Sequence, residues 1–144
     1  MRNTKKIIII CITLFVSIAT FFIIKQDSTP SLFKHHISNP IPTSVNNIKH
    51  EKNRLSIHGP FIFSFNVNNQ DLEKIIKTNE LIKYEEIPKN IDTLLNQFEN
   101  VSWWKSSNEL NKMTIYGKIV EKEYEWNIFF LFTNIDGIVY IIKM

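Results

Sequence analysis

The C-terminal stretch EYEWNIFFLFTNIDGIVYIIKM, residues 123–144, has the pattern of two β-strands joined by a tight turn. An apolar row occupies every second position of its first half: Tyr124, Trp126, Ile128, Phe130 and Phe132. Because strand side chains alternate between two faces, these residues share one face of a strand. The segment NIDG at 134–137 indicates the turn, in which Gly137 supplies a positive φ. The stretch therefore predicts an antiparallel pair ending in a strand over 138–144.

The opposite face of the first of these strands is apolar as well. It carries Phe129 and Leu131 between polar neighbours. A strand with apolar residues on both faces is covered on both. We expect a partner or the first strand of the domain to cover part of this second face.

Upstream segments predict two further strands and two helices. Period-2 alternation over 61–67 and over 113–120 is typical of half-buried strands. Asn68 or Asn69 suits the N-cap of a helix that runs to about residue 81. Pro88 opens a second helix, whose core face has the spacing i, i+3, i+4, i+7. That face consists of Ile91, Leu94, Leu95 and Phe98.

These elements predict an α+β domain over residues 58–144. Their order is β-α-α-β-β-β, and the strands are close enough along the chain to pair in antiparallel fashion. We expect a two-layer domain, with an antiparallel sheet and two helices on one face.

Residues 7–24 read IIIICITLFVSIATFFII, which is fifteen apolar residues, three hydroxyl residues and no charge. A helix of this length spans roughly 27 Å, about the thickness of a hydrocarbon core. The run begins at Ile7 and ends at Ile24, and three bases precede it. By the positive-inside rule, residues 1–6 form a cytoplasmic tail and the chain crosses the membrane once. The C-terminal domain is then periplasmic or otherwise extracytoplasmic, as in a bacterial inner-membrane protein.

A cleaved signal peptide is the alternative reading of this segment. Residues 7–16, followed by Ser17, Ile18 and Ala19, have the apolar length and the small residues of a cleavage site after Ala19. The cleaved product would be secreted. The apolar run continues past that site to Ile24, and this favours an uncleaved anchor.

Residues 25–57 predict a flexible basic linker. They contain three prolines, many Ser, Thr and Asn residues, and no sustained periodicity. About 30 flexible residues reach an r.m.s. distance of roughly 30 Å, which would hold the domain clear of the bilayer. The pair His35-His36 has no second ligand pair at metal-binding spacing, so no metal site is predicted.

Charge changes sign along the chain, although the whole chain is +3. Residues 1–24 hold three bases and no acid, and residues 25–54 hold five bases and two acids. Residues 55–144 hold nine bases and twelve acids, so the predicted domain is mildly acidic. Nucleic-acid binding needs a concentrated basic face on the folded unit, and the sequence predicts none.

The predicted domain offers little material for catalysis. It has one histidine, His58, no cysteine and three widely separated glycines, which leaves no phosphate loop or dinucleotide fingerprint. Its closely spaced carboxylate groups alternate with lysines or precede a proline, as on a solvated strand edge. They are Glu85, Glu86, Glu121, Glu123 and Glu125. We therefore predict no catalytic, cofactor-binding or metal-binding residues, and no enzyme activity.

The most distinctive local feature is the pair Trp103-Trp104. In extended chain, adjacent side chains point in opposite directions, so one ring can enter the core while the other stays outside. Core and rim packing is the simpler interpretation of both rings. In the alternative, the outward ring anchors a partner together with Tyr84 and Lys105, since Trp and Tyr dominate interface hot spots. The predicted partner-binding residues are thus Trp103, Trp104, Tyr84 and Lys105.

This organisation favours a membrane-anchored protein-binding module outside the cytoplasm. One form of it is an inhibitor or immunity protein that occupies an envelope-acting toxin or hydrolase. A second hypothesis is an accessory subunit of a secretion, pilus or division complex, which uses the membrane helix as well as the domain. A third is an envelope hydrolase with a carboxylate acid and base.

Overall fold

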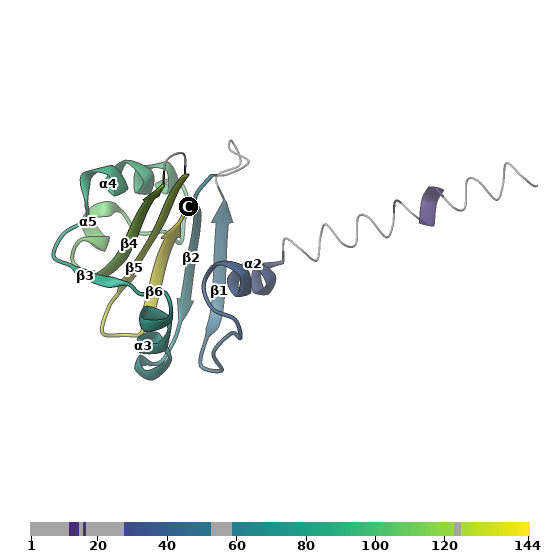
Figure 1. Cartoon of the computed structure of the whole chain (residues 1–144), viewed down its shortest axis with the longest axis horizontal. Helices are drawn as coiled ribbons and strands as arrows, with labels where there is room; N and C mark the ends of the chain where they lie inside the picture. Colours follow the sequence, from purple (N-terminus) through teal and green to yellow (C-terminus); the bar gives the residue numbers. More distant parts are fainter. Residues whose placement is uncertain (1–11, 15, 17–27, 53–58, 123–124) are drawn as a thin grey trace, which may run out of the picture.

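The computed structural model describes residues 12–14, 16, 28–52, 59–122 and 125–144. Six strands form one antiparallel sheet in the order β1-β2-β6-β5-β4-β3 (Figure 1). The strands are β1 (Asn46–Lys52), β2 (Phe61–Asn66), β3 (Ile82–Tyr84), β4 (Thr114–Lys122), β5 (Glu125–Thr133) and β6 (Ile138–Lys143). The helices are α2 (Thr29–His36), α3 (Asn69–Thr78), α4 (Lys89–Leu95), the 3-10 helix η1 (Asn96–Phe98) and α5 (Ser107–Leu110). The predicted α+β class with an antiparallel sheet is confirmed.

The C-terminal pair of strands forms as its sequence indicates. β5 and β6 pair with Leu131 opposite Ile141, and Gly137 in the turn has a φ of 73°. A Cβ at Gly137 would lie 2.8 Å from the carbonyl oxygen of Val67, so the turn needs glycine for space as well as for conformation. β6 also pairs with β2, which puts the last strand in the middle of the sheet.

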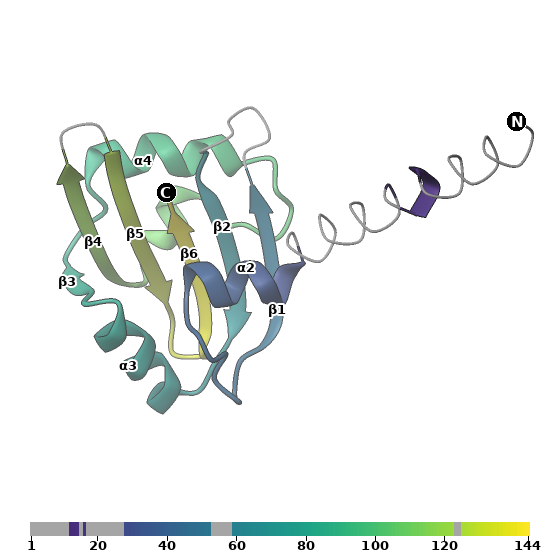
Figure 2. The same cartoon turned by 45° about the vertical axis from the view of Figure 1, so that its right-hand side comes forward.

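Helices cover both faces of the sheet, so the prediction of two helices on one face in two layers is wrong. In Figure 2, α2 lies in front of the sheet, α3 lies at its lower end and α4 lies behind it. Leu72 and Ile75 of α3 pack in the same core as α2. The front core joins Phe33 and Ile75 to residues of β2, β5 and β6, among them Phe63 and Leu131. The rear core joins residues of α4, η1 and α5 to the alternate positions of the same strands. The central strands are apolar on both faces, and only a three-layer arrangement buries both.

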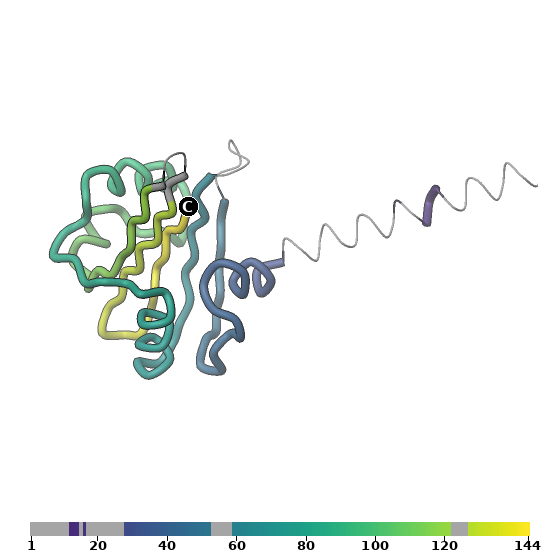
Figure 3. Tube along the Cα trace, viewed as in Figure 1, coloured from purple at the N-terminus to yellow at the C-terminus, as the bar shows by residue number. Residues whose placement is uncertain are grey.

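The segment predicted as a flexible linker belongs to the folded unit over residues 28–52. Phe33 of α2 is fully buried, and its ring lies 4.9 Å from that of Phe65 in an edge-to-face contact. β1 pairs with β2 along its length, with Lys52 opposite Phe61. Figure 3 shows this stretch returning along the edge of the sheet. The prediction failed because α2 buries few apolar residues and β1 is a polar edge strand.

This change of boundary also changes the charge of the folded unit. From Ser28 to the C-terminus the chain holds thirteen bases and thirteen acids, so the unit is neutral rather than mildly acidic. Its bases are concentrated early, with Lys34, Lys49 and Lys52 in α2 and β1. The N-terminal edge of the sheet is therefore its basic edge.

Other elements follow their local sequence signals. Asn68 caps α3 as predicted, because its side chain accepts a hydrogen bond from the backbone N–H of Asp71. The carboxylate of Asp71 accepts a hydrogen bond from the hydroxyl of Ser44, which joins the N-terminal segment to α3. β3 and α5 were not predicted, although Ser106 and Glu109 form the capping box that begins α5.

Most of the predicted membrane anchor lies outside the described residues. Within 7–24 only residues 12–14 and 16 are described, and all four are helical. None of the helices that the structure describes has the length and apolar character needed to cross a membrane.

Candidate functional site

The two adjacent tryptophans occupy the loop between η1 and α5, and they differ in burial. Trp104 is 8% exposed, and its ring packs 5.8 Å from that of Tyr140 and 6.3 Å from that of Phe98. Its indole Nε1 is buried and has no hydrogen-bond partner. Trp103 is half-buried and meets Trp104 edge to face at 6.0 Å. Trp104 is thus a core residue, and Trp103 remains accessible.

Trp103 lines a hollow of about 450 Å³ on the rear face of the sheet, which we call the Trp103 hollow. Residues of β1, β2 and β6 line the rest of it. These are Asn47, Ile48, Lys49, Ser64, Asn66, Ile138 and Tyr140. The lining combines two aromatic rings and the side chain of Ile138 with amides, one hydroxyl and one amine. The side chain of Ile48 packs against the front core.

The hollow exists because the rear core does not extend along the whole of β2. Ile62 is buried in that core, but Ser64 and Asn66, the next residues of β2 on the same face, are polar. The pairing of β1 with β2 is also irregular here, and Asn47 has a φ of 53°. Polar side chains and an irregular edge strand therefore leave this corner of the sheet open.

The other two predicted partner-binding residues lie in different places. Lys105 forms an ion pair of 3.0 Å with Glu109, and their hydrogen bond raises the pKa of Lys105. Lys105 follows Trp104 directly in the same loop, and a charge interaction with Tyr140 also raises its pKa. Tyr84 belongs to β3 at the opposite edge of the sheet, with its ring 5.1 Å from that of Phe130. Trp103, Trp104 and Lys105 therefore lie together in one loop, and the fold separates Tyr84 from them.

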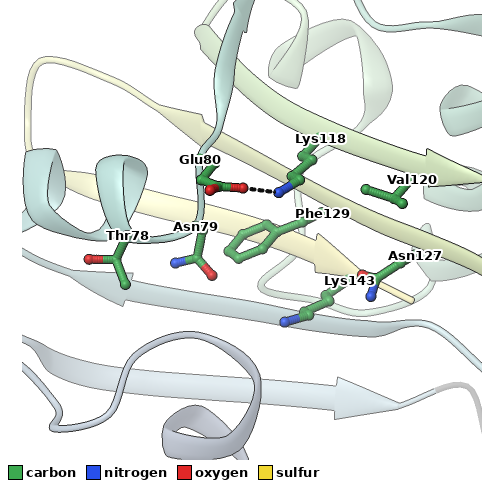
Figure 4. A pocket seen from close by; sticks show the side chains of 8 residues that line it. All are labelled: Thr78, Asn79, Glu80, Lys118, Val120, Asn127, Phe129 and Lys143. Carbon is green, nitrogen blue, oxygen red and sulfur yellow. Dashed lines mark hydrogen bonds and ion pairs between the residues drawn. The ribbon is translucent and has the colours of Figure 1, made fainter.

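A second cavity, of about 330 Å³, lies on the front face near the C-terminal end of α3 (Figure 4). We call it the Lys143 pocket, and sequence reasoning missed it. Its lining comes from the end of α3 and from β4, β5 and β6. These residues are Thr78, Asn79, Glu80, Lys118, Val120, Asn127, Phe129 and Lys143.

The two lysines of this pocket have different partners. The amine of Lys118 forms an ion pair with Glu80, and this hydrogen bond lowers the pKa of the carboxyl group. The amine of Lys143 donates to the backbone carbonyl of His36 and lies 5.1 Å from the ring centroid of Phe129. Burial lowers the pKa of Lys143. The pocket therefore has one neutralised amine and one partly buried amine without a carboxylate among the described residues.

His36 connects this pocket to α2. Its ring packs at a tilt against Phe61 with the centroids 4.5 Å apart, and it lies near the basic groups of His35, Lys143 and Lys52. Burial first, and then these three neighbours, lower the pKa of His36 from 6.5 to about 4. The imidazole is therefore neutral in the folded protein at neutral pH.

This lowered pKa predicts a loss of stability in acid. Between pH 6.5 and about 4 the unfolded chain binds a proton at His36 that the folded chain does not. The free energy of unfolding therefore decreases as the pH is lowered through this range. We expect His36→Gln to make this fall shallower in urea unfolding measured at pH 7 and pH 4.5. An unchanged difference between the two pH values would contradict the assignment.

Of the carboxylates considered for hydrolysis, the structure describes the side chains of three. Glu85, Glu86 and Glu121 are exposed. Glu123 and His58 lie outside the described residues, and the side chain of Glu125 is not described. Within the described part of the chain, no three His, Cys, Asp or Glu side chains are placed to hold a metal ion.

Comparison of the chain with protein-family models, with curated proteins and with solved structures finds no match. The site must therefore be interpreted from its own geometry and chemistry.

Proposed function

We propose that this chain is a membrane-anchored binding module that holds a protein partner at the Trp103 hollow, outside the cytoplasm. In its most specific form it is an inhibitor or immunity protein that occupies an envelope-acting toxin or hydrolase. The observation that carries the proposal is the accessible ring of Trp103 beside a hollow of about 450 Å³. Half-buried tryptophans next to a cavity are typical anchors of protein interfaces.

The packing behind Trp103 supports this role. Its ring rests edge to face on Trp104, which in turn contacts the buried ring of Tyr140. A side chain held in this way loses little conformational freedom on binding, and this lowers the entropic cost of association. Trp103 is therefore a preorganised contact rather than a freely moving one.

The lining of the hollow indicates what a partner presents. The ring of Trp103 and the side chain of Ile138, beside the buried ring of Tyr140, suit a protruding apolar side chain. Lys49 at the rim suits a neighbouring carboxylate, and the amide of Asn66 can bond to the partner's backbone. We expect an apolar anchor residue flanked by an acidic one.

The short distance between the predicted anchor and the domain restricts where this partner binds. If the membrane helix ends at Ile24, only residues 25–28 separate it from the first turn of α2. Four residues span at most about 14 Å, so the domain lies close to the bilayer instead of standing roughly 30 Å away. The partner is then a membrane protein or one that acts at the membrane surface.

The proposal predicts that Trp103→Ala abolishes partner capture. Affinity-tagged full chain in a mild nonionic detergent would be incubated with envelope extract of the source cell, and bound proteins would be identified by mass spectrometry. We expect a protein held by the wild type to be lost with Trp103→Ala, with affinity falling about thirtyfold or more, the loss that a hot-spot residue produces.

Tyr84→Ala is the matched control, because Tyr84 is also aromatic and lies at the opposite edge of the sheet. It should retain the captured protein. Exchange of residues 7–24 for an unrelated membrane helix should also leave capture intact, whereas an accessory subunit that works through its anchor would lose it. Equal capture by wild type and Trp103→Ala would contradict the proposal.

A further inference from the structure

Cations and aromatic rings alternate in one row across five strands on the front face of the sheet. Cross-strand pairing puts Lys118 opposite Phe129, Phe129 opposite Lys143, Lys143 opposite Phe61, and Phe61 opposite Lys52. Directly opposed residues share a face of the sheet, so the five side chains lie side by side. Two of the lysine amines lie over rings, at 5.0 Å for Lys52 and 5.1 Å for Lys143.

α2 packs over one half of this row, and a cavity borders the other half. The ring of His36 packs against Phe61, so α2 covers the half near β1. The other half, from Lys143 through Phe129 to Lys118, forms the floor of the Lys143 pocket. Figure 4 shows Phe129 between the two lysines, with Asn127 beside Lys143.

The charge on this floor is unevenly compensated. Glu80 pairs with Lys118 and holds that amine at one side of the pocket. An ammonium group has three N–H donors, and Lys143 uses one on the carbonyl of His36. Its partial burial makes the missing negative partner costly, which is why the pKa of its amine is lowered.

We propose that the Lys143 pocket binds a small monoanion, a carboxylate group attached to an apolar or aromatic body. The carboxylate accepts hydrogen bonds from the amine of Lys143 and from the amide of Asn127, which makes no hydrogen bond to another described side chain. The apolar body lies on the half-buried side chain of Val120 and reaches the small exposed part of Phe129. Glu80 stays on Lys118 and repels a second negative charge, so a dianion is disfavoured.

The size and position of the pocket fit this ligand. A cavity of about 330 Å³ is near the lower end of the range for small-molecule sites. It lies on the front face of the sheet, whereas the Trp103 hollow lies on the rear face, so the two sites are independent. Failure of one proposal leaves the other standing.

Benzoate is the probe that tests this site. Amide signals of the isotope-labelled full chain would be followed by NMR in a nonionic detergent, with benzamide as the neutral matched ligand and inorganic phosphate as an oxyanion without an apolar body. We expect benzoate to shift the signals of Asn127, Phe129 and Lys143, and both controls to bind at least about tenfold more weakly, the worth of one charge-assisted hydrogen bond.

Variants separate the two amines of the pocket. Lys143→Met keeps most of the length of the side chain and removes the charge, and we expect benzoate binding to weaken about tenfold or more. Lys118→Met should weaken it less than about threefold, because Glu80 already neutralises that amine. Thermal unfolding would check that each variant is folded.

Three results would overturn the proposal. They are benzamide or phosphate binding as tightly as benzoate, Lys143→Met binding benzoate as the wild type does, and benzoate shifts confined to residues outside the pocket. Lys118→Met losing as much affinity as Lys143→Met would also overturn the assignment of the carboxylate to Lys143.

Discussion

Replacing Phe33 by alanine is expected to lower the free energy of unfolding by about 3–5 kcal/mol. The Phe33 side chain is fully buried in the front core, and it packs edge to face on Phe63 and Phe65. Removing a buried ring loses its transfer free energy and leaves a cavity that the rigid sheet cannot close. Since small domains are stable by only about 5–15 kcal/mol, the loss is easily measured by urea unfolding of the full chain in detergent.

Lys34→Ala is the matched control for this experiment. Lys34 is the next residue of α2 and is exposed, so its replacement should change the unfolding free energy by about 0.5 kcal/mol or less. If residues 28–52 were a flexible linker, Phe33→Ala would change the free energy of unfolding as little as Lys34→Ala does. That result would contradict the placement of α2 in the core.

Replacing Trp104 by alanine is expected to cost a similar amount, about 3–5 kcal/mol. Trp104 is 8% exposed and fills the rear core between Phe98 and Tyr140. Its unpaired indole Nε1 already costs some stability, so Trp104→Phe should be much milder than Trp104→Ala. Chemical unfolding monitored by far-UV circular dichroism would measure both variants.

Trp103→Ala provides the comparison for these variants. Trp103 is half-buried at the rim of the rear core. Its replacement should lower the free energy of unfolding by about 1–2 kcal/mol, because the partly buried side chain and its ring contact with Trp104 are lost. The folded protein therefore survives that change, as the capture experiment requires. Equal destabilisation by Trp103→Ala and Trp104→Ala would contradict the assignment of one ring to the core and the other to the surface.

Long periodic segments of this chain could be predicted from sequence, and short ones could not. β2 and β5 have apolar residues at period two, β6 is a continuous apolar run after a turn signal, and α3 has both a cap and an apolar stripe. In contrast, α2 has eight residues of which Phe33 alone is buried, and β3 has three residues at the sheet edge. Such elements form because they pack against the neighbouring sheet. This is a tertiary effect, and it leaves little pattern in the local sequence.

The placement of the helices was mispredicted for a related reason. The apolar residues Phe129 and Leu131 indicated that the second face of β5 is covered, and the covering elements are α2 and α3. Element order alone does not tell on which face of a sheet a helix packs. Counting the strands that are apolar on both faces would have favoured three layers.

The candidate sites were only partly predictable. Trp103 stood out by residue type, but its separation from Tyr84 follows from strand order across the whole sheet. The Lys143 pocket depends on which residues oppose each other on β4, β5 and β6. Register of this kind depends on the turns and on the faces that are buried, and no short motif encodes it.

The most direct test of the proposed binding role is hydrogen–deuterium exchange of the full chain with and without the captured partner. Our account predicts that the partner slows exchange in residues 46–49 and in the loop 101–106, which surround the Trp103 hollow. Exchange in β3, where Tyr84 lies, should not change. Slowed exchange in β3, with residues 46–49 and 101–106 unaffected, would contradict it.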